Sequence, residues 1–497
     1  MNATDLTALL PILVLGGCCI LTMLTIAIRR DHATITLLSG ASCLLTLAAL
    51  PLAAGAAPHA VTALLLIDGY ALFFMGLLVS ATLVVMALSH GYLRLRFDEH
   101  EDFEEFYLLL LLATLGGLVL VASVHLASFF LGLELIGVSL YSLIGYLRTR
   151  RGPLEAALKY LMLSASASAF LLFGMALMYF EIGTMAFREM GVRLAAEPQT
   201  PALWLAGFML TLTGIGFKLG LVPFHLWIPD VYQGAPAPVT AFVATVSKGA
   251  VFAVLLRFVG ELQALQLGRL GFLFGALSAA SMFAGNFLAL LQNNVKRLLA
   301  YSSIAHFGYL LVALLAGGAV AAEAVTFYLV AYFITTLGAF GIVTILSKEA
   351  GDAEALEDYR GLFWSHPWLA GSFMLMLLSL TGIPLTVGFV GKFYAIAAGV
   401  EGQLWFLVVL LVINSAISAY YYLRLILTLV EQPDQPAYQV SAWRPIGLEP
   451  GHRWTVMLSL GLVTAMLLGL GVYPGPLMEF IRAMLGPLVR SAMTVAS

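Results

Sequence analysis

The sequence predicts an all-α membrane protein with about fourteen transmembrane helices in a single polytopic domain spanning residues 1–497. Of its 497 residues, 61% are hydrophobic and only 10% are charged, whereas a soluble domain usually carries about 25% charged residues. Apolar runs of about 20 residues, the length that crosses a hydrocarbon core, recur along nearly the whole chain. This pattern leaves no room for a large soluble domain.

Apolar runs bounded by charged residues, glycine or proline define the expected helices. They cover residues 6–28, 34–54, 70–92, 107–124, 126–147, 154–180, 202–226, 237–258, 270–291, 298–317, 322–346, 369–399, 404–429 and 455–476.

The seventh and twelfth expected helices are broken by Pro223 and Pro384, and each carries a buried lysine, Lys218 and Lys392. A proline inside a helix removes a backbone hydrogen bond, and freed carbonyls at membrane depth must face protein or a water-filled cavity. Helices five spans apart cross in opposite directions, as in inverted-topology repeats. We therefore predict N-terminal helices one to three in 1–106, a first five-helix repeat in 107–260, a second in 268–430, and helix fourteen with a tail in 454–497.

Basic residues indicate the orientation, because positively charged loops stay on the cytoplasmic side. Fourteen lie on one side of the expected topology: Arg29, Arg30, Arg94, Arg96, Arg148, Arg150, Arg151, Lys296, Arg297, Lys348, Arg360, Arg424, Arg444 and Arg453. Six lie on the other: Arg188, Arg193, Arg257, Arg269, Arg482 and Arg490. We expect a multi-pass protein of a bacterial inner membrane with both termini in the periplasm, and an N-terminus that is not a cleaved signal.

Several function classes are disfavoured. The net charge is −3, without a basic cluster that would bind nucleic acid. Cys18, Cys19 and Cys43 lie in apolar runs without metal-site spacing. Nucleotide-binding glycine motifs, HExxH and a trustworthy pair of haem ligands are also missing from the sequence. We therefore expect neither electron transfer nor nucleotide hydrolysis in this chain, and no metal.

Among the charged residues inside the expected spans, we single out five as candidates: Glu134, Lys159, Lys218, Lys248 and Lys392. One charge at the bilayer centre is unfavourable by roughly 2.5–3.5 kcal/mol, so together they would disfavour the fold by on the order of 15 kcal/mol. Structure alone rarely requires this. For Lys159, near a helix start, the alternative is that the amine reaches up to the headgroups.

Such groups are suited to proton transfer. Desolvation lowers the pKa of a lysine and a nearby carboxylate raises it, so moving or neutralising Glu134 would switch Lys218 between holding and releasing a proton. His225 and His306 titrate near neutrality and could relay protons between lysines. A simple hydrogen-bonding role for either histidine stays open.

Four runs make the chain recognisable: FFLGLELIGVSLYSLIGY, FKLGLVPFHLWIPDVYQGAPAPVTAFVATVSKGAVF at 217–252, NNVKRLLAYSSIAHFGYLLVAL and LTGIPLTVGFVGKFY. They resemble the subunit N family of bacterial NADH-quinone oxidoreductase, respiratory complex I, over essentially the whole chain. The run WIPDVYQGAPAPV separates that family from its sister subunits and from stand-alone multisubunit cation/proton antiporters.

The resemblance implies the fourteen-helix fold with two inverted repeats, and a proton pathway through the membrane. The positions that match it are Glu134 in helix five, Lys218 in helix seven, Lys248 in helix eight, Lys392 in helix twelve, and the polar positions Lys159, His225 and His306. A lysine in helix twelve also favours subunit N over the sister subunit M, which has glutamate there.

The resemblance further implies that the chain binds no cofactor, since NADH, FMN, iron–sulfur clusters and quinone belong to partner subunits. Expected partners are the other membrane-arm subunits, both antiporter-like and small, together with lipid and protons. Two alternatives stay open: a stand-alone cation/proton antiporter subunit of the same fold, and a structural membrane-arm subunit whose buried charges only hold neighbours together.

Overall fold

The computed structural model describes residues 2–97, 102–197, 199–263, 268–349, 351–432 and 453–494. Within these ranges, thirteen helices are long and apolar enough to cross a membrane. The remaining expected crossing, at 369–399, is made of two helices of 15 residues each, α17 and α18. The helical multi-pass fold is therefore confirmed. Arg444, counted in the charge bias, lies outside the described residues.

The elements follow one another in chain order. They are α1 (Ala3–Ala8), α2 (Leu10–Ile28), α3 (His32–Ala54), β1 (His59–Val61), β2 (Leu65–Ile67), α4 (Gly69–Arg96), α5 (Glu105–Ala122), α6 (Leu126–Ile144), α7 (Arg151–Ile182), α8 (Phe187–Ala196), α9 (Ala202–Leu219), α10 (Trp227–Gly234), α11 (Ala237–Phe242), the π-helical turn η1 (Val243–Ser247), α12 (Lys248–Glu261), α13 (Gly268–Leu290), α14 (Val295–Leu315), α15 (Gly318–Leu346), the 3-10 turn η3 (Leu356–Tyr359), α16 (Leu362–Ser365), α17 (Pro367–Thr381), α18 (Val387–Glu401), α19 (Trp405–Val430), α20 (Arg453–Val472) and α21 (Gly475–Thr494).

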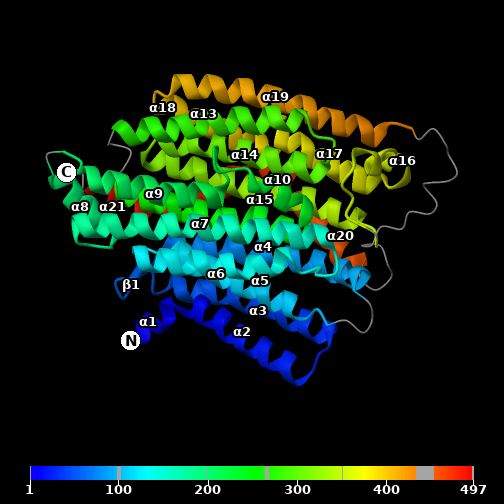
Figure 1. The fold of residues 1–497 in the computed structure, drawn as a ribbon, viewed down its shortest axis with the longest axis horizontal. Helices are drawn as coiled ribbons and strands as arrows, with labels where there is room; N and C mark the ends of the chain where they lie inside the picture. Colours follow the sequence, from blue (N-terminus) through cyan, green and yellow to red (C-terminus); the bar gives the residue numbers. More distant parts are fainter. Residues whose placement is uncertain are drawn as a thin grey trace.

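The long helices run side by side in one bundle, with α2 and α3 along one edge and α19 along the opposite edge (Figure 1). The short elements α1, β1 and α8 lie at one end, and α16 lies at the other. We call this second end, which includes the loops that carry Arg148 and Lys348, the arginine-rich end. Helices α14 and α15 lie inside the bundle, since nearly all their residues are buried.

Several elements were not expected from the sequence, among them α10 and the following three. Strands β1 and β2 form an antiparallel hairpin in which Ala60 pairs with Leu66. Helix α8 follows α7 at the same end of the bundle. Helix α21, expected only as a tail, packs on α4 and α15. It lies so close to α4 that a Cβ on Gly69 would come within 2.5 Å of the Met484 carbonyl oxygen.

Glycines bring three pairs of helices into close contact: α5 with α6, α7 with α9, and α13 with α14. In each pair, a Cβ added to either glycine would lie 2.4–2.9 Å from a backbone atom of the facing helix. Small residues let membrane helices approach this closely and pack without voids. The glycines are Gly116 and Gly132, Gly174 and Gly207, and Gly285 and Gly308.

Two membrane helices end in the same way. Helices α9 and α17 are followed by Gly220 and Gly382, whose φ angles are +74° and +91°. The next residues, Leu221 and Ile383, donate their N–H groups to the carbonyl five residues earlier, at 2.8 and 3.0 Å. This is the Schellman pattern, which needs glycine at the left-handed position. The grouping of helices into two inverted repeats, with the domain boundaries given above, stays a prediction.

Replacing Gly207 by valine should destabilise the protein. Its Cβ would lie 2.7 Å from the Gly174 carbonyl oxygen, so α7 and α9 would have to separate, at about 1–3 kcal/mol for an overpacked contact. A thermal melt of the purified complex should show a lower transition temperature. Gly371→Val is the control, because nothing lies within 4 Å of its Cβ position; equal melting of the two variants would contradict the close-contact argument.

Candidate functional site

Three lysines are buried in the middle of the bundle: Lys218 on α9, Lys248 on α12 and Lys392 on α18. Their exposed fractions are 7%, 0% and 5%. Each ammonium donates a hydrogen bond of 2.8 Å to a serine hydroxyl, and the pairs are Lys218 with Ser164, Lys248 with Ser303, and Lys392 with Ser415. Within the described residues, none of the three contacts a carboxylate.

Lys218 occupies the last turn of α9, where α6 and α7 meet it. Gly137 on α6 makes room for the ammonium, because a Cβ there would lie 3.2 Å from Lys218 Nζ. On α7, Ser164 Oγ also accepts a hydrogen bond from the Tyr141 hydroxyl at 3.0 Å. Glu134, partly exposed on α6, accepts from Ser168 Oγ at 2.5 Å. The predicted partners Glu134 and Lys218 therefore lie near the same two turns of α7 without contacting each other directly.

Lys248 directly follows η1, the π-helical turn Val243–Ser247. Single π-helical turns are rare and occur often at functional sites. The ammonium lies 5.3 Å from the Tyr232 ring centre and 5.1 Å from that of Phe307, where the ring faces attract a cation. A Cβ on Gly220, at the end of α9, would come 3.7 Å from Lys248 Nζ. The left-handed turn after Lys218 thus faces Lys248.

Lys392 lies near the start of α18, beside the end of α17. It donates to the carbonyl oxygen of Thr381, the last residue of α17, at 2.8 Å. Carbonyls at a helix C-terminus have no partner within the helix and carry partial negative charge. The Tyr309 ring centre lies 5.2 Å from the ammonium. A helix-end carbonyl, a hydroxyl and a ring face therefore surround this charge.

His306 lies between the second and third lysines. Its Nδ1 is 2.9 Å from the Tyr328 hydroxyl, and its ring is 5.5 Å from Tyr309, the ring under Lys392. On the other side, Tyr332 packs on His306 at 5.8 Å and donates to Ser303, which also holds Lys248. His306, the predicted relay residue, is thus surrounded by hydroxyl-bearing side chains.

The other two predicted residues lie apart from this cluster. His225 is in the segment between α9 and α10, and its buried Nδ1 has no hydrogen-bond partner among the described residues. The Lys159 side chain is 44% exposed and pairs with Glu155 and Asp230, both at 2.8 Å. A cavity of about 310 Å³ lies beside it, lined in part by these three residues. Roles for His225 and Lys159 in proton transfer stay predictions.

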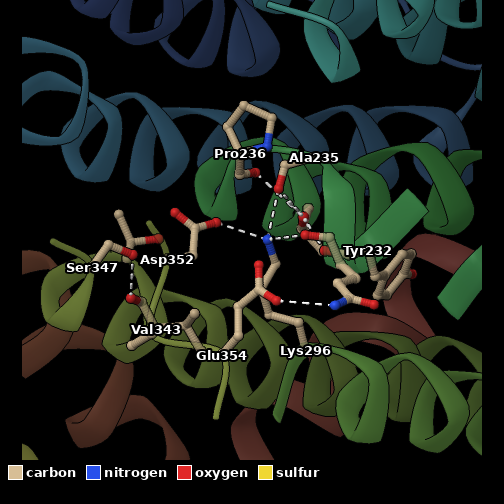
Figure 2. Close-up of polar contacts among 12 residues, drawn as sticks. Tyr232, Ala235, Pro236, Lys296, Val343, Ser347, Asp352 and Glu354 are labelled. Atoms are coloured by element: carbon tan, nitrogen blue, oxygen red, sulfur yellow. Dashed lines mark hydrogen bonds and ion pairs between the residues drawn. The ribbon is translucent and has the colours of Figure 1, made fainter. Parts of the chain in front are cut away.

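A second buried charge cluster was missed by the sequence analysis. Figure 2 shows Lys296, which is fully buried and donates to the Asp352 carboxylate at 2.7 Å and to the Ala235 and Gln233 carbonyls. Asp352 also pairs with Arg96 at 2.7 Å. These contacts tie the segment after α15 to α4, α10 and α14 at the arginine-rich end.

The expected helix start explains the omission. The expected tenth helix begins at residue 298 and so leaves Lys296 in a loop, whereas α14 begins at Val295. Asn294, whose side chain accepts from the Arg297 N–H, caps the helix. An asparagine is a common N-cap residue, so the sequence NNVK contained a signal for the earlier start.

The described residues do not suggest a metal site. Within the described ranges, no group of three or more His, Cys, Asp or Glu residues could hold a metal ion. The expectation that NADH, FMN, iron–sulfur clusters and quinone belong to partner subunits stays a prediction.

Known proteins match the chain over nearly its whole length. Residues 123–418 match the family model described as NADH:quinone oxidoreductase/Mrp antiporter, transmembrane. NADH-quinone oxidoreductase subunit N from Ectopseudomonas mendocina is 49% identical over 97% of this chain and 96% of its own length. The subunit N from Methylococcus capsulatus is 49% identical over 96% and 95%. A chain of respiratory complex I from Thermus thermophilus with bound aureothin is 34% identical, covers 94% of this chain and 98% of its own, and has a TM-score of 0.79.

Asp352→Asn should destabilise the protein by about 3–5 kcal/mol, because it leaves the Lys296 and Arg96 charges uncompensated. Burial raises the pKa of Asp352, but Lys296 and Arg96 outweigh this and hold it below its usual value. The ion-pair contribution is therefore complete above about pH 4 and is lost as the pH falls through the lowered pKa.

The measurement is thermal unfolding of the purified complex at about pH 5 and about pH 8, where the carboxylate is ionised throughout. The native protein and Asp352→Asn should differ by the same amount at both values. Asp358→Asn is the control, since Asp358 pairs with Lys348, whose side chain is 49% exposed. A loss no greater than that of the control would contradict the structural role of the cluster.

Proposed function

Because the chain belongs to the subunit N family of NADH-quinone oxidoreductase and is a proton-translocating membrane-arm subunit, we propose that Lys218, Lys248 and Lys392 carry the protons that it moves. The observation behind this proposal is that each ammonium is held by a neutral hydroxyl and not by a carboxylate. A buried ammonium in direct contact with a carboxylate is strongly held in its charged form. Hydroxyls satisfy the hydrogen bonds of the ammonium and leave its proton exchangeable.

The proposed pathway follows the three lysines across the bundle. Glu134 and Lys218 form the switchable pair, because a change in the charge or position of the carboxylate changes how firmly Lys218 holds its proton. Lys248, beside the turn that follows Lys218, is the central relay. The cluster around His306 joins Lys248 to Lys392, the last group of the row. Lys159 and His225, which lie apart from the central cluster, would extend this pathway.

The membrane orientation follows from the charge bias. We place the arginine-rich end in the cytoplasm and the end with α1 and α8 in the periplasm of a bacterial inner membrane. Both termini then face the periplasm. The chain is a subunit of an oxidoreductase complex with membrane-arm partner subunits. We place redox catalysis and all cofactors in those partners, so this chain contributes only proton transfer.

The stand-alone antiporter alternative is not favoured. The relatives that share 49% of residues over nearly the full chain are named as subunit N of the oxidoreductase. The structural alternative differs from our proposal in one respect that experiment can decide: it requires the buried lysines for assembly but not for proton movement.

Lys218→Ala is expected to lower proton pumping by about a hundredfold or more, the usual contribution of a proton-transfer group, while the complex still assembles. Proton uptake and NADH-quinone electron transfer should be measured together in membrane vesicles, with native gels to follow assembly. Lys348→Ala is the control, since this lysine pairs with Asp358 in a loop at the arginine-rich end.

The possible results separate the hypotheses. Loss of pumping with intact assembly supports the proposed pathway. Loss of assembly supports the structural alternative, and normal pumping in Lys218→Ala overturns the proposal. Proton/cation exchange by the isolated chain in lipid vesicles, without any redox reaction, would support the antiporter alternative instead.

A further inference from the structure

Helix α7 carries three serines within five residues, Ser164, Ser166 and Ser168. Ser164 and Ser168 are one helical turn apart, so both side chains lie on the same face. This face is buried against α6 and α9, whereas Ser166 is exposed and donates only to its own helix, to the Met162 carbonyl oxygen at 3.0 Å. The pattern therefore separates two serines that face the proposed pathway from one that does not.

The two buried serines contact opposite charges, one as a hydrogen-bond acceptor and the other as a donor. Ser164 Oγ accepts from the Lys218 ammonium at 2.8 Å, and Ser168 Oγ donates to the Glu134 carboxylate at 2.5 Å. Each hydroxyl thus presents the correct end of its dipole to its charged partner. One face of α7 therefore contacts the ammonium through Ser164 and the carboxylate through Ser168.

The backbone around them keeps this spacing. Glu134 and Gly137 are three residues apart on α6, and the missing side chain of Gly137 leaves the space that the Lys218 ammonium occupies. The glycine contact of Gly174 with Gly207 fixes α7 against α9 on the other side. Lys218 therefore lies beside the turn that carries Glu134 and yet is hydrogen-bonded to α7.

We propose that Ser164 and Ser168 are positioning residues of the proton pathway, which hold Glu134 and Lys218 as a hydroxyl-separated pair instead of a direct ion pair. The attraction between two charges falls in inverse proportion to their distance. In direct contact the carboxylate would retain the proton on the lysine, whereas the separated arrangement leaves an attraction that a small displacement can change. The inference rests on the proposed function, since it assigns Lys218 to transport.

The test compares Ser164→Ala, Ser168→Ala and Ser166→Ala in the assembled complex. Ser164→Ala should lower proton pumping by about tenfold, which corresponds to losing one hydrogen bond to a charged group. It should also move the alkaline limb of the pumping pH profile to lower pH, because the charged form of Lys218 loses an acceptor. Ser166→Ala should leave both unchanged, and Ser168→Thr, which keeps the hydroxyl, should pump better than Ser168→Ala.

A double variant tests whether Ser168 acts through Glu134. If it does, adding Ser168→Ala to Glu134→Gln should cause little further loss, and the two effects should not add. Fully additive effects would overturn the inference for Ser168. The inference is overturned for both serines if the variants reduce the amount of assembled complex but the assembled part pumps with an unshifted pH profile. It is also overturned if Ser164→Ala and Ser168→Ala behave like Ser166→Ala.

The failure of the inference can be told apart from the failure of the proposed function. If Lys218→Ala abolishes pumping and the serine variants do not impair it, only the positioning role is wrong. If Lys218→Ala pumps normally, the proposed pathway itself is wrong.

Discussion

A buried ammonium group must find its hydrogen-bond acceptors inside the protein, because hydrocarbon offers none. In this chain, Lys218, Lys248 and Lys392 meet that constraint with serine hydroxyls, aromatic faces and the free carbonyl that ends α17. Helix interruptions supply part of this environment, since they expose carbonyls that an unbroken helix would use itself. For Lys392, the end of α17 therefore supplies part of the polar surroundings that its charge requires.

The buried charges at the arginine-rich end are treated differently. There Asp352 pairs with Lys296 and Arg96, and Lys296 also binds two carbonyls around the end of α10. This arrangement fixes charge in place, as expected of a structural cluster. Under the proposed function, the contrast between the carboxylate-paired Lys296 and the three hydroxyl-paired lysines separates a charge that anchors the fold from charges that exchange a proton.

Much of the fold could be predicted from the sequence because the bilayer imposes a long apolar run for every crossing. The central lysines could be identified for a related reason, since Lys218, Lys248 and Lys392 are conspicuous within such runs. Lys296 was missed because it stands one residue inside α14, where a span edge and a loop look alike in composition. The serine partners were also missed, because serine is small and common in membrane helices. Only helix packing, such as that of α7 on α9, shows which serines face a lysine.

The π-helical turn η1 determines how the helix that follows it is rotated. A π-helical turn holds about one residue more than an α-helical turn, and one residue corresponds to about 100° of rotation along a helix. The five residues Val243–Ser247 therefore determine the direction in which the side chains of α12 point, beginning with Lys248. The contact between the Lys248 ammonium and Ser303 therefore depends on the number of residues in this turn. Removing a single residue there would rotate the lysine out of register while leaving the composition of the helix almost unchanged.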